Sequence, residues 1–468
     1  VQLMWYEYLF SLISLYLIVA VVAGVHVLVH KRNSRAAFGW LGLIILFPIA
    51  GAVLYALFGI NRVRRKALRV SQESEVSQKT PVQQANPATG AQLDRPGFCI
   101  TDREARPGNE VTTYYNGEQA FPAMLDAIDA AREEVLLSSY IFDNDETGKR
   151  FIDRLQQSSQ RGVTVCVLVD DVGIRYSLPT IIRELKRAGL PFVRFMPLRL
   201  LPPSFSINLR THRKILVADR RVCFAGGMNI GDRQLLHGPS PHRASDLHFG
   251  FRGPVVRDFV DLFEDDWRFF GGDALEPRTG VDTEHGSAHC RLVSDGPDET
   301  LDSMKLVFMG AISNARRRIW IMTPYFLPER QMMGCLQAAA LSGVDIQVMI
   351  PQKNNWPLVQ WALQHNMVEL LTTGVKILQR PPPFAHNKCF LVDDDYVIVG
   401  SSNLDPRSLR LNFELGVEVF DPHLNGELAS HFSEVAASCN PFTVERIESR
   451  SYPARIRDGA AALFTPYI

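Results

Sequence analysis

The stretch HRKILVAD (residues 212–219) and the stretch HNKCFLVD (residues 386–393) share the pattern HxKxxxxD. Seventeen residues after each histidine comes an asparagine, Asn229 in GGMN and Asn403 in GSSN. A single HxK has little meaning, but two copies with the same small-residue turn and the same spacing are very unlikely to arise by accident. The chain therefore contains a duplicated unit with one motif in each copy.

The repeat continues upstream of both motifs. The helical pattern FPAMLDAIDAAREE leads to the strand-like VLLSSYIF, and MKLVFMGAISNARRR leads in the same way to IWIMTPYF; next, RGVTVCVLVDD matches SGVDIQVMIPQ, and AGLPFV matches TGVKIL. Strands that are apolar nearly throughout are typical of a sheet with helices on both faces. We predict two similar α/β halves with pseudo-twofold symmetry, the first over residues 98–290 and the second over residues 291–468.

An apolar region precedes this duplication. Residues 8–30 and 37–60 carry no formal charge, and each is long enough as a helix to cross the hydrocarbon core. Pro48 and Gly51 either kink the second segment or turn it into a re-entrant hairpin, and we expect a second span. A signal peptide is the alternative for the first segment, but a basic stretch does not precede it and a second apolar run follows. We therefore predict an N-terminal α-helical membrane hairpin over residues 1–62.

The basic residues around this hairpin predict its orientation. Three lie between the two segments, within residues 31–35, and five follow the second segment, within residues 62–69. The larger group marks the cytoplasmic side, which favours a cytoplasmic position for the duplicated part. Residues 63–97 begin with this basic group and continue rich in Ser, Gln, Thr and Pro, so we predict a juxtamembrane segment and linker there.

Charge and cysteine content exclude several classes of site. Lys plus Arg and Asp plus Glu both number 50, so the formal net charge of zero argues against a nucleic-acid partner. The seven cysteines are scattered singly, which suggests neither a disulfide framework nor a zinc site.

The motifs suit phosphodiester exchange. Residues two apart in a strand point to one face, so His212 with Lys214 and His386 with Lys388 each project a base and a cation together. Two ammonium groups neutralise a phosphodiester, while the two asparagines donate amide hydrogen bonds to it. A neutral histidine then attacks phosphorus and a protonated one gives its proton to the departing alkoxide. This chemistry requires neither a metal nor a cofactor.

Acidic and basic residues near the motifs have candidate supporting roles. A nucleophilic histidine needs a group that fixes its tautomer, for which Asp246 and Glu414 are candidates. Asp219 and Asp393 lie an odd number of residues from their histidines, so an unbroken strand would turn them to the opposite face, and we expect structural hydrogen bonding from both. Candidates for contact with a lipid phosphate, with solvated or sheet-edge positions as the alternative, are Arg210, Arg213 and Arg407.

At these residues the sequence resembles the phospholipase D superfamily, whose signature is the doubled HKD motif, over roughly residues 110–440. Within it the bacterial cardiolipin synthases are the most similar, because RNSRAAFGWLGLIILFPIAGAVLYALFG resembles their paired membrane segments and NLDPRSLRLNFELGVEV their second-motif block. The resemblance implies His212 as nucleophile and His386 as general acid and then base. It also implies that Glu414 supports His212 and Asp246 supports His386, crosswise between halves, and it places Asp219 and Asp393 in the catalytic motif.

The reaction implied by the resemblance is phosphatidyl transfer from one phosphatidylglycerol to another, giving cardiolipin and glycerol in a bacterial inner (cytoplasmic) membrane. The partners are then phospholipids and the bilayer. The second lipid substrate, phosphatidylglycerol or phosphatidylethanolamine, and the number of subunits, a homo-oligomer included, stay open. The alternatives with the same centre are a hydrolytic phospholipase D, which uses water, and a phosphatidylserine synthase, which uses serine. A membrane-bound nuclease or an inactive scaffold would belong to a different class.

Overall fold

The computed structural model describes residues 2–31, 34–59, 91–197, 209–276, 283–296 and 302–465. It divides into two compact units: one contains the described residues up to 59 and the other contains those from 91 onward. Most of the predicted linker, residues 63–90, lies outside the described residues.

The N-terminal unit is a group of apolar helices: α1 (Gln2–His30), α2 (Ser34–Leu46), α3 (Pro48–Leu54) and the π-helical turn η1 (Tyr55–Gly59). Among the described residues, Ile13–His30 is the stretch long and apolar enough to cross a membrane. The second predicted segment is broken at Phe47, because Pro48 lacks the N–H that would continue α2 and instead begins a new helix. α3 packs against both α1 and α2. Whether this second segment crosses a membrane stays a prediction.

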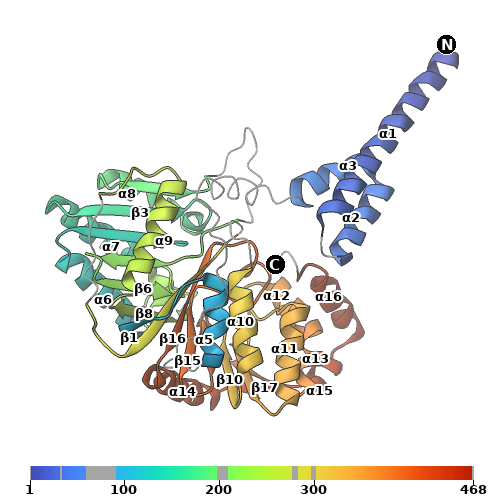
Figure 1. The fold of residues 1–468 in the computed structure, drawn as a ribbon. Coiled ribbons are helices and arrows are strands. Elements are labelled where there is room, and N and C mark those ends of the chain that lie inside the picture. The colour runs from blue at the N-terminus through green and yellow to red at the C-terminus, as the bar shows by residue number, and fades with distance from the viewer. Residues whose placement is uncertain are drawn as a thin grey trace. The chain divides into compact units, whose positions relative to one another are not determined.

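The larger unit has one sheet of 15 strands among its described residues, in the order β17-β12-β11-β10-β14-β15-β16-β9-β1-β8-β6-β5-β2-β3-β4. Figure 1 shows the first half, in green and yellow, beside the second half, in orange and red. The strands of the first half are β1 (Arg106–Tyr115), β2 (Glu134–Ser139), β3 (Thr164–Asp170), β4 (Phe192–Phe195), β5 (Ile215–Ala218), β6 (Val222–Gly226) and β8 (Leu247–Arg252). Those of the second are β9 (Ala288–Asp295), β10 (Arg318–Met322), β11 (Asp345–Pro351), β12 (Lys376–Arg380), β14 (Cys389–Val392), β15 (Tyr396–Gly400), β16 (Glu414–Phe420) and β17 (Asn440–Phe442).

The order of the strands confirms the predicted duplication. From the antiparallel pair β1 and β9 at the centre, both halves read outward in the same sequence, so that β8, β6, β5, β2, β3 and β4 correspond to β16, β15, β14, β10, β11 and β12. The two half-sheets are continuous with one another, and the predicted boundary after residue 290 falls inside β9. The parallel strands β2 and β3 are buried almost throughout, as their continuous apolar runs predict.

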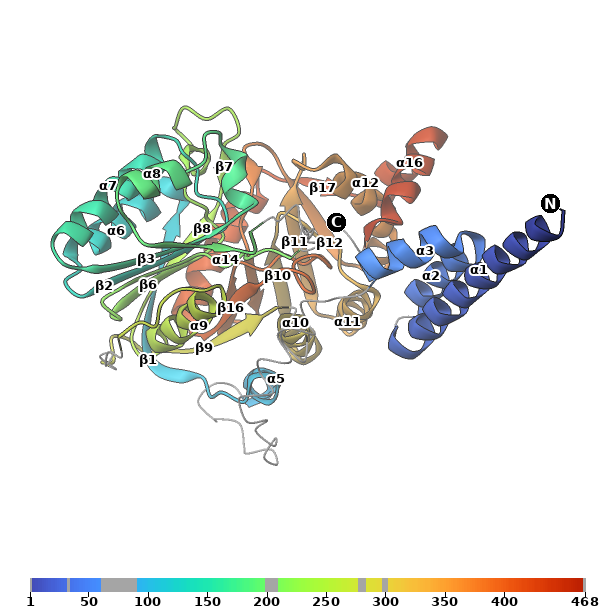
Figure 2. The same ribbon diagram turned by 90° about the horizontal axis from the view of Figure 1, so that it is seen from above.

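Helices cover both faces of this sheet, and Figure 2 shows α6 (Asn116–Ala130) and α7 (Glu146–Gln160) on one face of the first half and α9 (Val256–Phe269) on the other. The remaining helices are α5 (Ala91–Thr101), α8 (Ile182–Arg187), α10 (Ser303–Asn314), α11 (Arg330–Leu341), α12 (Pro357–Asn366), α13 (Val368–Leu371), α14 (Pro422–Ala436), α15 (Val444–Glu448) and α16 (Tyr452–Ala462). Two apolar clusters, one in each half, fill the space between helices and sheet.

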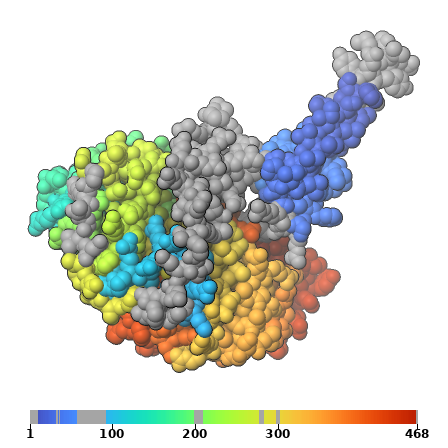
Figure 3. Space-filling view, in the orientation of Figure 1, coloured from blue at the N-terminus to red at the C-terminus, as the bar shows by residue number. Residues whose placement is uncertain are grey.

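The linker prediction is wrong for residues 91–97, which form the first part of α5. This helix packs against α10, and Figure 3 shows α5 and β1, in light blue, at the surface between the first half, in green and yellow, and the second, in orange and red. The Arg291 side chain of β9 is 0% exposed, and its guanidinium donates to Asp94 Oδ1 of α5 at 2.8 Å and to Glu418 Oε2 of β16 at 2.6 Å. A Cβ at Gly97 would collide with Glu418, so α5 can lie this close only with glycine there.

Arg291→Met should lower the free energy of unfolding by about 3–5 kcal/mol, because it leaves two buried carboxylates without their cation. The measurement is a denaturant titration of the full chain in detergent. Arg330→Met, which breaks an exposed pair with Glu369, is the matched control and should cost at most about 1 kcal/mol. Equal, small losses in both variants would show that the buried cluster does not hold α5 in place.

Candidate active site

His212 lies just before β5, and its backbone is bonded to the second half of the chain. Its N–H donates to the Phe413 carbonyl at 2.8 Å, which brings the next residue, Glu414, beside the imidazole. His212 Nδ1 lies 3.0 Å from Glu414 Oε2 and 3.0 Å from the Ser401 carbonyl oxygen. Since a carbonyl oxygen accepts only, Nδ1 carries the proton and Nε2 keeps its lone pair.

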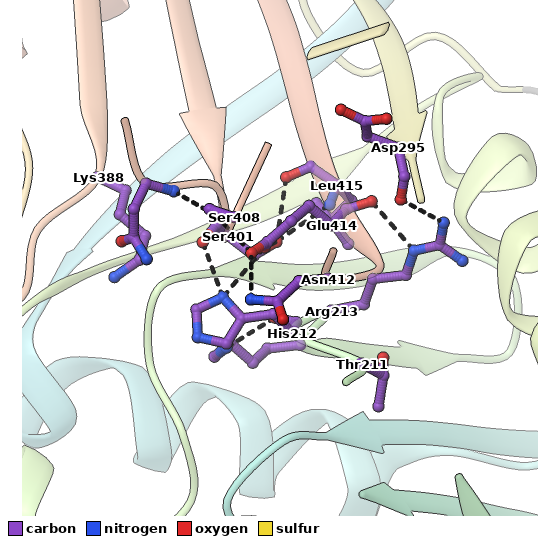
Figure 4. A network of polar contacts seen from close by, with 12 residues as sticks. Thr211, His212, Arg213, Asp295, Lys388, Ser401, Ser408, Asn412, Glu414 and Leu415 are labelled. Carbon is purple, nitrogen blue, oxygen red and sulfur yellow. Dashed lines mark hydrogen bonds and ion pairs between the residues drawn. The ribbon is translucent and has the colours of Figure 1, made fainter. Parts of the chain in front are cut away.

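The Glu414 carboxylate is the centre of a polar network (Figure 4). It is fully buried, and besides His212 it accepts hydrogen bonds from Ser401 Oγ, Ser408 Oγ and Asn412 Nδ2. Burial would raise the pKa of Glu414, but the adjacent His212 and Lys214 and the hydrogen bonds lower it below its usual value. Glu414 therefore remains ionised and fixes the tautomer and orientation of His212.

His386 repeats this arrangement with a carboxylate of the first half. Its N–H donates to the Ser245 carbonyl at 2.7 Å, next to the short parallel pairing of β7 (Ala244–Ser245) with β13 (Phe384–Ala385). His386 Nδ1 lies 2.7 Å from Asp246 Oδ2. A Cβ at Gly227 would lie 2.5 Å from Asp246 Oδ1, so this approach requires a glycine. Burial, reinforced by Lys388 and opposed by Asp246, lowers the pKa of His386 to about 4, so the imidazole is neutral at pH 7.

The two lysines of the motifs are buried behind the histidines, with Lys214 3% and Lys388 4% exposed. Each ammonium donates to the carbonyl of its own histidine, at 2.6 Å for Lys214 and 2.8 Å for Lys388, and Lys388 Nζ also lies 3.1 Å from both ring nitrogens of His386. Burial lowers the pKa of Lys214 to about 7 and that of Lys388 to about 8. A bound phosphate would raise both pKa values again.

One cavity of about 1140 Å³ has both histidines and both asparagines in its wall. Asn229 Oδ1 accepts a hydrogen bond from the Ile141 N–H at 3.1 Å, which leaves its amide nitrogen for a ligand. Asn403 lines the same cavity, and its Oδ1 is buried without a hydrogen-bond partner among the described residues. The structure thus brings together the histidines and asparagines that the sequence predicts, although donation by the amides to a phosphate stays a prediction.

The three arginines proposed as phosphate contacts have different surroundings. Arg407 lines the cavity, and it forms no ion pair with any of the described residues. Arg210 lines it too, but its guanidinium lies 3.7 Å from Asp170. Arg213 was wrong as a candidate contact, because it points away from the cavity and bonds to Asp266 at 2.7 Å and to the Glu414 carbonyl at 3.1 Å. It positions the strand that carries Glu414.

Asp219 and Asp393 are not part of the site, although they belong to the signature motif. The Asp219 carboxylate accepts from the backbone N–H groups of residues 132–134, and the Asp393 carboxylate accepts from those of residues 316–318. Both residues have positive φ, at the end of their strand. Their inclusion among the catalytic residues is therefore corrected, and the structure agrees with the structural role that strand parity predicts.

Sequence reasoning missed several residues of the site. Ser408 and Asn412, which hold Glu414, lie in a loop whose fold no periodic pattern reveals. Tyr140 places its ring 5.3 Å from that of His212 and 5.6 Å from Lys214 Nζ. Arg233 lines the cavity and is the counterpart of Arg407, since both lie four residues after the motif asparagine; extending the repeat alignment would have found it.

Two imidazoles, each fixed at Nδ1 by a buried carboxylate of the other half, and two lysines beside one cavity define a phosphodiester-transfer enzyme of the phospholipase D type. The family model described as "Cardiolipin synthase, PLD-like domain" matches residues 124–239 and 308–436, more than half of the chain. A second model, "Phospholipase_D-nuclease N-terminal", matches residues 18–59. The chain belongs to the cardiolipin synthase family.

Curated relatives match over nearly the whole length. The major cardiolipin synthase ClsA of Bacillus subtilis is 31% identical over 477 residues, covering 98% of this chain and 99% of the relative. The cardiolipin synthase of Geobacillus thermodenitrificans is 30% identical over 452 residues, covering 94% of this chain and 90% of the relative. Among solved structures, the phosphatidylserine synthase of Haemophilus influenzae shares the fold, with a TM-score of 0.60 at 14% identity over 76% of this chain and 95% of that one.

Glu414→Gln should reduce the rate of phosphodiester transfer by roughly 10⁴-fold with little change in KM, as expected when a histidine loses its orienting carboxylate. Asp219→Ala should instead lower the free energy of unfolding by about 1–3 kcal/mol, because three backbone donors lose their acceptor, and leave the rate close to wild type. Initial rates and denaturant titrations on both variants test the distinction. A large loss of rate without a loss of stability in Asp219→Ala would restore that residue to the catalytic group.

Proposed function

We propose that the chain makes cardiolipin by moving a phosphatidyl group from one phosphatidylglycerol to another, with release of glycerol and a phosphatidyl-histidine intermediate at His212. Membership of the family makes the chain a cardiolipin synthase and a phosphatidyltransferase. The observation that supports the mechanism is the crosswise pairing of each histidine with a buried carboxylate of the other half, on the wall of one cavity.

In the first step, His212 Nε2 attacks the phosphorus of the donor lipid. A P–N bond forms, the P–O bond to glycerol breaks, and the glycerol oxygen takes a proton from His386. Burial lowers the pKa of His386 to about 4, so it must gain a proton when the substrate binds. The anionic phosphodiester favours that uptake, because a nearby negative charge raises the pKa of an imidazole.

In the second step, a hydroxyl of the acceptor phosphatidylglycerol gives its proton to His386 and attacks the phosphorus. The P–N bond breaks, and His212 Nε2 regains its lone pair. One phosphodiester replaces another, so the reaction consumes no nucleotide. Lys214, Lys388, Asn229 and Asn403 stabilise the charge on the phosphoryl oxygens in both steps. Because water would give phosphatidic acid instead, the enclosed position of the centre favours transfer to lipid.

The chain associates with a membrane, as its apolar helix Ile13–His30 and the N-terminal family match indicate. We propose in addition that residues 1–62 form a two-span anchor in the bacterial inner membrane, with the catalytic unit on the cytoplasmic side. The five basic residues within 62–69, against three within 31–35, support this orientation.

His212→Ala should abolish both cardiolipin formation and covalent labelling of the protein by phosphatidylglycerol with a labelled phosphate. An alkaline quench preserves a phosphohistidine, so wild-type protein should retain label that acid then releases. His423→Ala, an exposed histidine on α14, is the control and should label like wild type. Label retained by His212→Ala and lost from His386→Ala would reverse the assigned roles, and phosphatidic acid as the main wild-type product would indicate a hydrolase.

The value of kcat/KM should fall as pH rises through neutrality, because His386 must gain a proton to act as the general acid, and it should fall further above about pH 7–8, far below the usual range of lysine. The second fall arises because the free enzyme holds phosphate with the protonated forms of Lys214 and Lys388, whose pKa values burial lowers to about 7 and about 8. Burial also lowers the pKa of His212, so the loss of activity on the acid side should begin below the usual histidine value. Initial rates at limiting phosphatidylglycerol between about pH 5 and pH 10 provide the measurement. A profile that stays flat to the alkaline end would contradict the role of the lysines.

A further inference from the structure

The pseudo-twofold symmetry is broken at one pair of corresponding strand ends. In the first half, the last pair of β3 and β4 is Asp170 with Phe195. In the second half, the last pair of β11 and β12 is Pro351 with Arg380. An acid and an aromatic ring in one half therefore correspond to a proline and a cation in the other, beside otherwise equivalent catalytic motifs.

At the ends of β3 and β4, the described residues of the first half include no cation that lacks an anionic partner. Arg210, which lines the cavity here, is buried and lies 3.7 Å from Asp170. The position that corresponds to Arg380 is occupied by Phe195, whose ring packs against Phe413 at 4.9 Å and Phe270 at 3.9 Å. At this strand end the first half thus has a cation paired with a carboxylate, and an aromatic ring packed against other rings.

On the side of the second half, Arg380 lines the cavity together with His386. Its guanidinium donates to Asn387 Oδ1 at 3.1 Å and to Ser245 Oγ at 3.1 Å, both of them neutral groups. Proline at position 351 cannot supply the carboxylate that Asp170 supplies to Arg210, and no ion pair of Arg380 occurs within the described ranges. Asn387 is 3% exposed, and its Nδ2 is buried without a hydrogen-bond partner in the described part of the chain.

The partly buried Arg380 guanidinium still carries its charge at neutral pH, so an anionic ligand beside it would be stabilised. Ser245 and Asn387 are also the chain neighbours of Asp246 and His386, which places this polar group directly beside the general acid and base. The acceptor hydroxyl must reach His386, and in phosphatidylglycerol only the glycerol headgroup separates that hydroxyl from the lipid's own phosphodiester. An anion of the acceptor therefore has to lie close to His386.

We propose that Arg380, Asn387 and Ser245 form a subsite for the phosphodiester of the acceptor phosphatidylglycerol, distinct from the centre where phosphorus is transferred. This inference rests on the proposed function. A guanidinium fork suits two phosphate oxygens, and Asn387 and Ser245 hold the Arg380 guanidinium at the cavity wall by accepting its hydrogen bonds. The asymmetry then makes the two lipid positions unequal: the donor's phosphate lies between the histidines, and the acceptor's lies on the side of the second half.

Two acceptors test this subsite, phosphatidylglycerol, which carries a phosphodiester, and glycerol, which does not. Transfer to phosphatidylglycerol gives cardiolipin, whereas transfer to labelled glycerol regenerates phosphatidylglycerol through the same intermediate and needs no acceptor phosphate. Arg380→Gln in the full chain in mixed micelles should reduce cardiolipin formation by about 10- to 100-fold, as expected for lost charge-assisted hydrogen bonds, and raise the KM for the acceptor. Glycerol exchange should stay near the wild-type rate, which also shows that the variant is folded.

The matched control is Arg446→Gln, which removes an exposed arginine that donates to the neighbouring Gln379 and lies outside the cavity wall. It should leave both reactions unchanged, and Arg380→Lys should recover part of the cardiolipin rate. An equal loss of both reactions in Arg380→Gln, or no loss of either, would overturn the subsite. Wild-type protein that exchanges glycerol without making cardiolipin would instead overturn the proposed function.

Discussion

The geometry of the active site depends on backbone hydrogen bonds that cross between the two halves. The N–H of His212 donates to the carbonyl of Phe413, and the N–H of His386 donates to that of Ser245, so each motif is fixed by the half that does not contain it. Each bond brings the following carboxylate to the imidazole: Glu414 to His212 and Asp246 to His386. Two similar halves thus produce one site, because each pair of a histidine and its carboxylate takes one residue from each half.

The electrostatics of the site depend on cations that are buried at the cavity or close to it. His386 and Arg380 line the cavity, and the two lysines lie next to the histidines, where burial lowers the lysine pKa values to about 7 and about 8. Cationic groups that the fold already holds beside the histidines need little reorganisation when a phosphodiester binds. The substrate's charge completes the balance, which links lipid binding to uptake of the proton that the leaving group later receives.

The sequence predicts the duplication, the histidines and lysines, and the crosswise carboxylates, because repetition at fixed spacing and family resemblance both report on them. Strand parity correctly separates Asp219 and Asp393 from the site. The residues that it does not reveal depend on three-dimensional register. Ser408 and Asn412 contact Glu414 from an irregular loop. Arg380 stands out as a candidate ligand contact only when the pairing of β12 with β11 is compared with that of β4 with β3. The start of α5 was also missed, since Asp94 is tied to Arg291 of β9, 197 residues away, and no local pattern reveals such a contact.

The separation along the chain between partners has a consequence for synthesis of the protein. His212 precedes Glu414 by 202 residues and Asp246 precedes His386 by 140, so both dyads form through long-range contacts. A growing polypeptide can therefore bury the core of its first half and still lack a functioning nucleophile until residue 414 has been added and β16 has joined the sheet. Incomplete chains therefore cannot attack the phosphodiesters of the bilayer, and only the completed fold can react with the surrounding lipid.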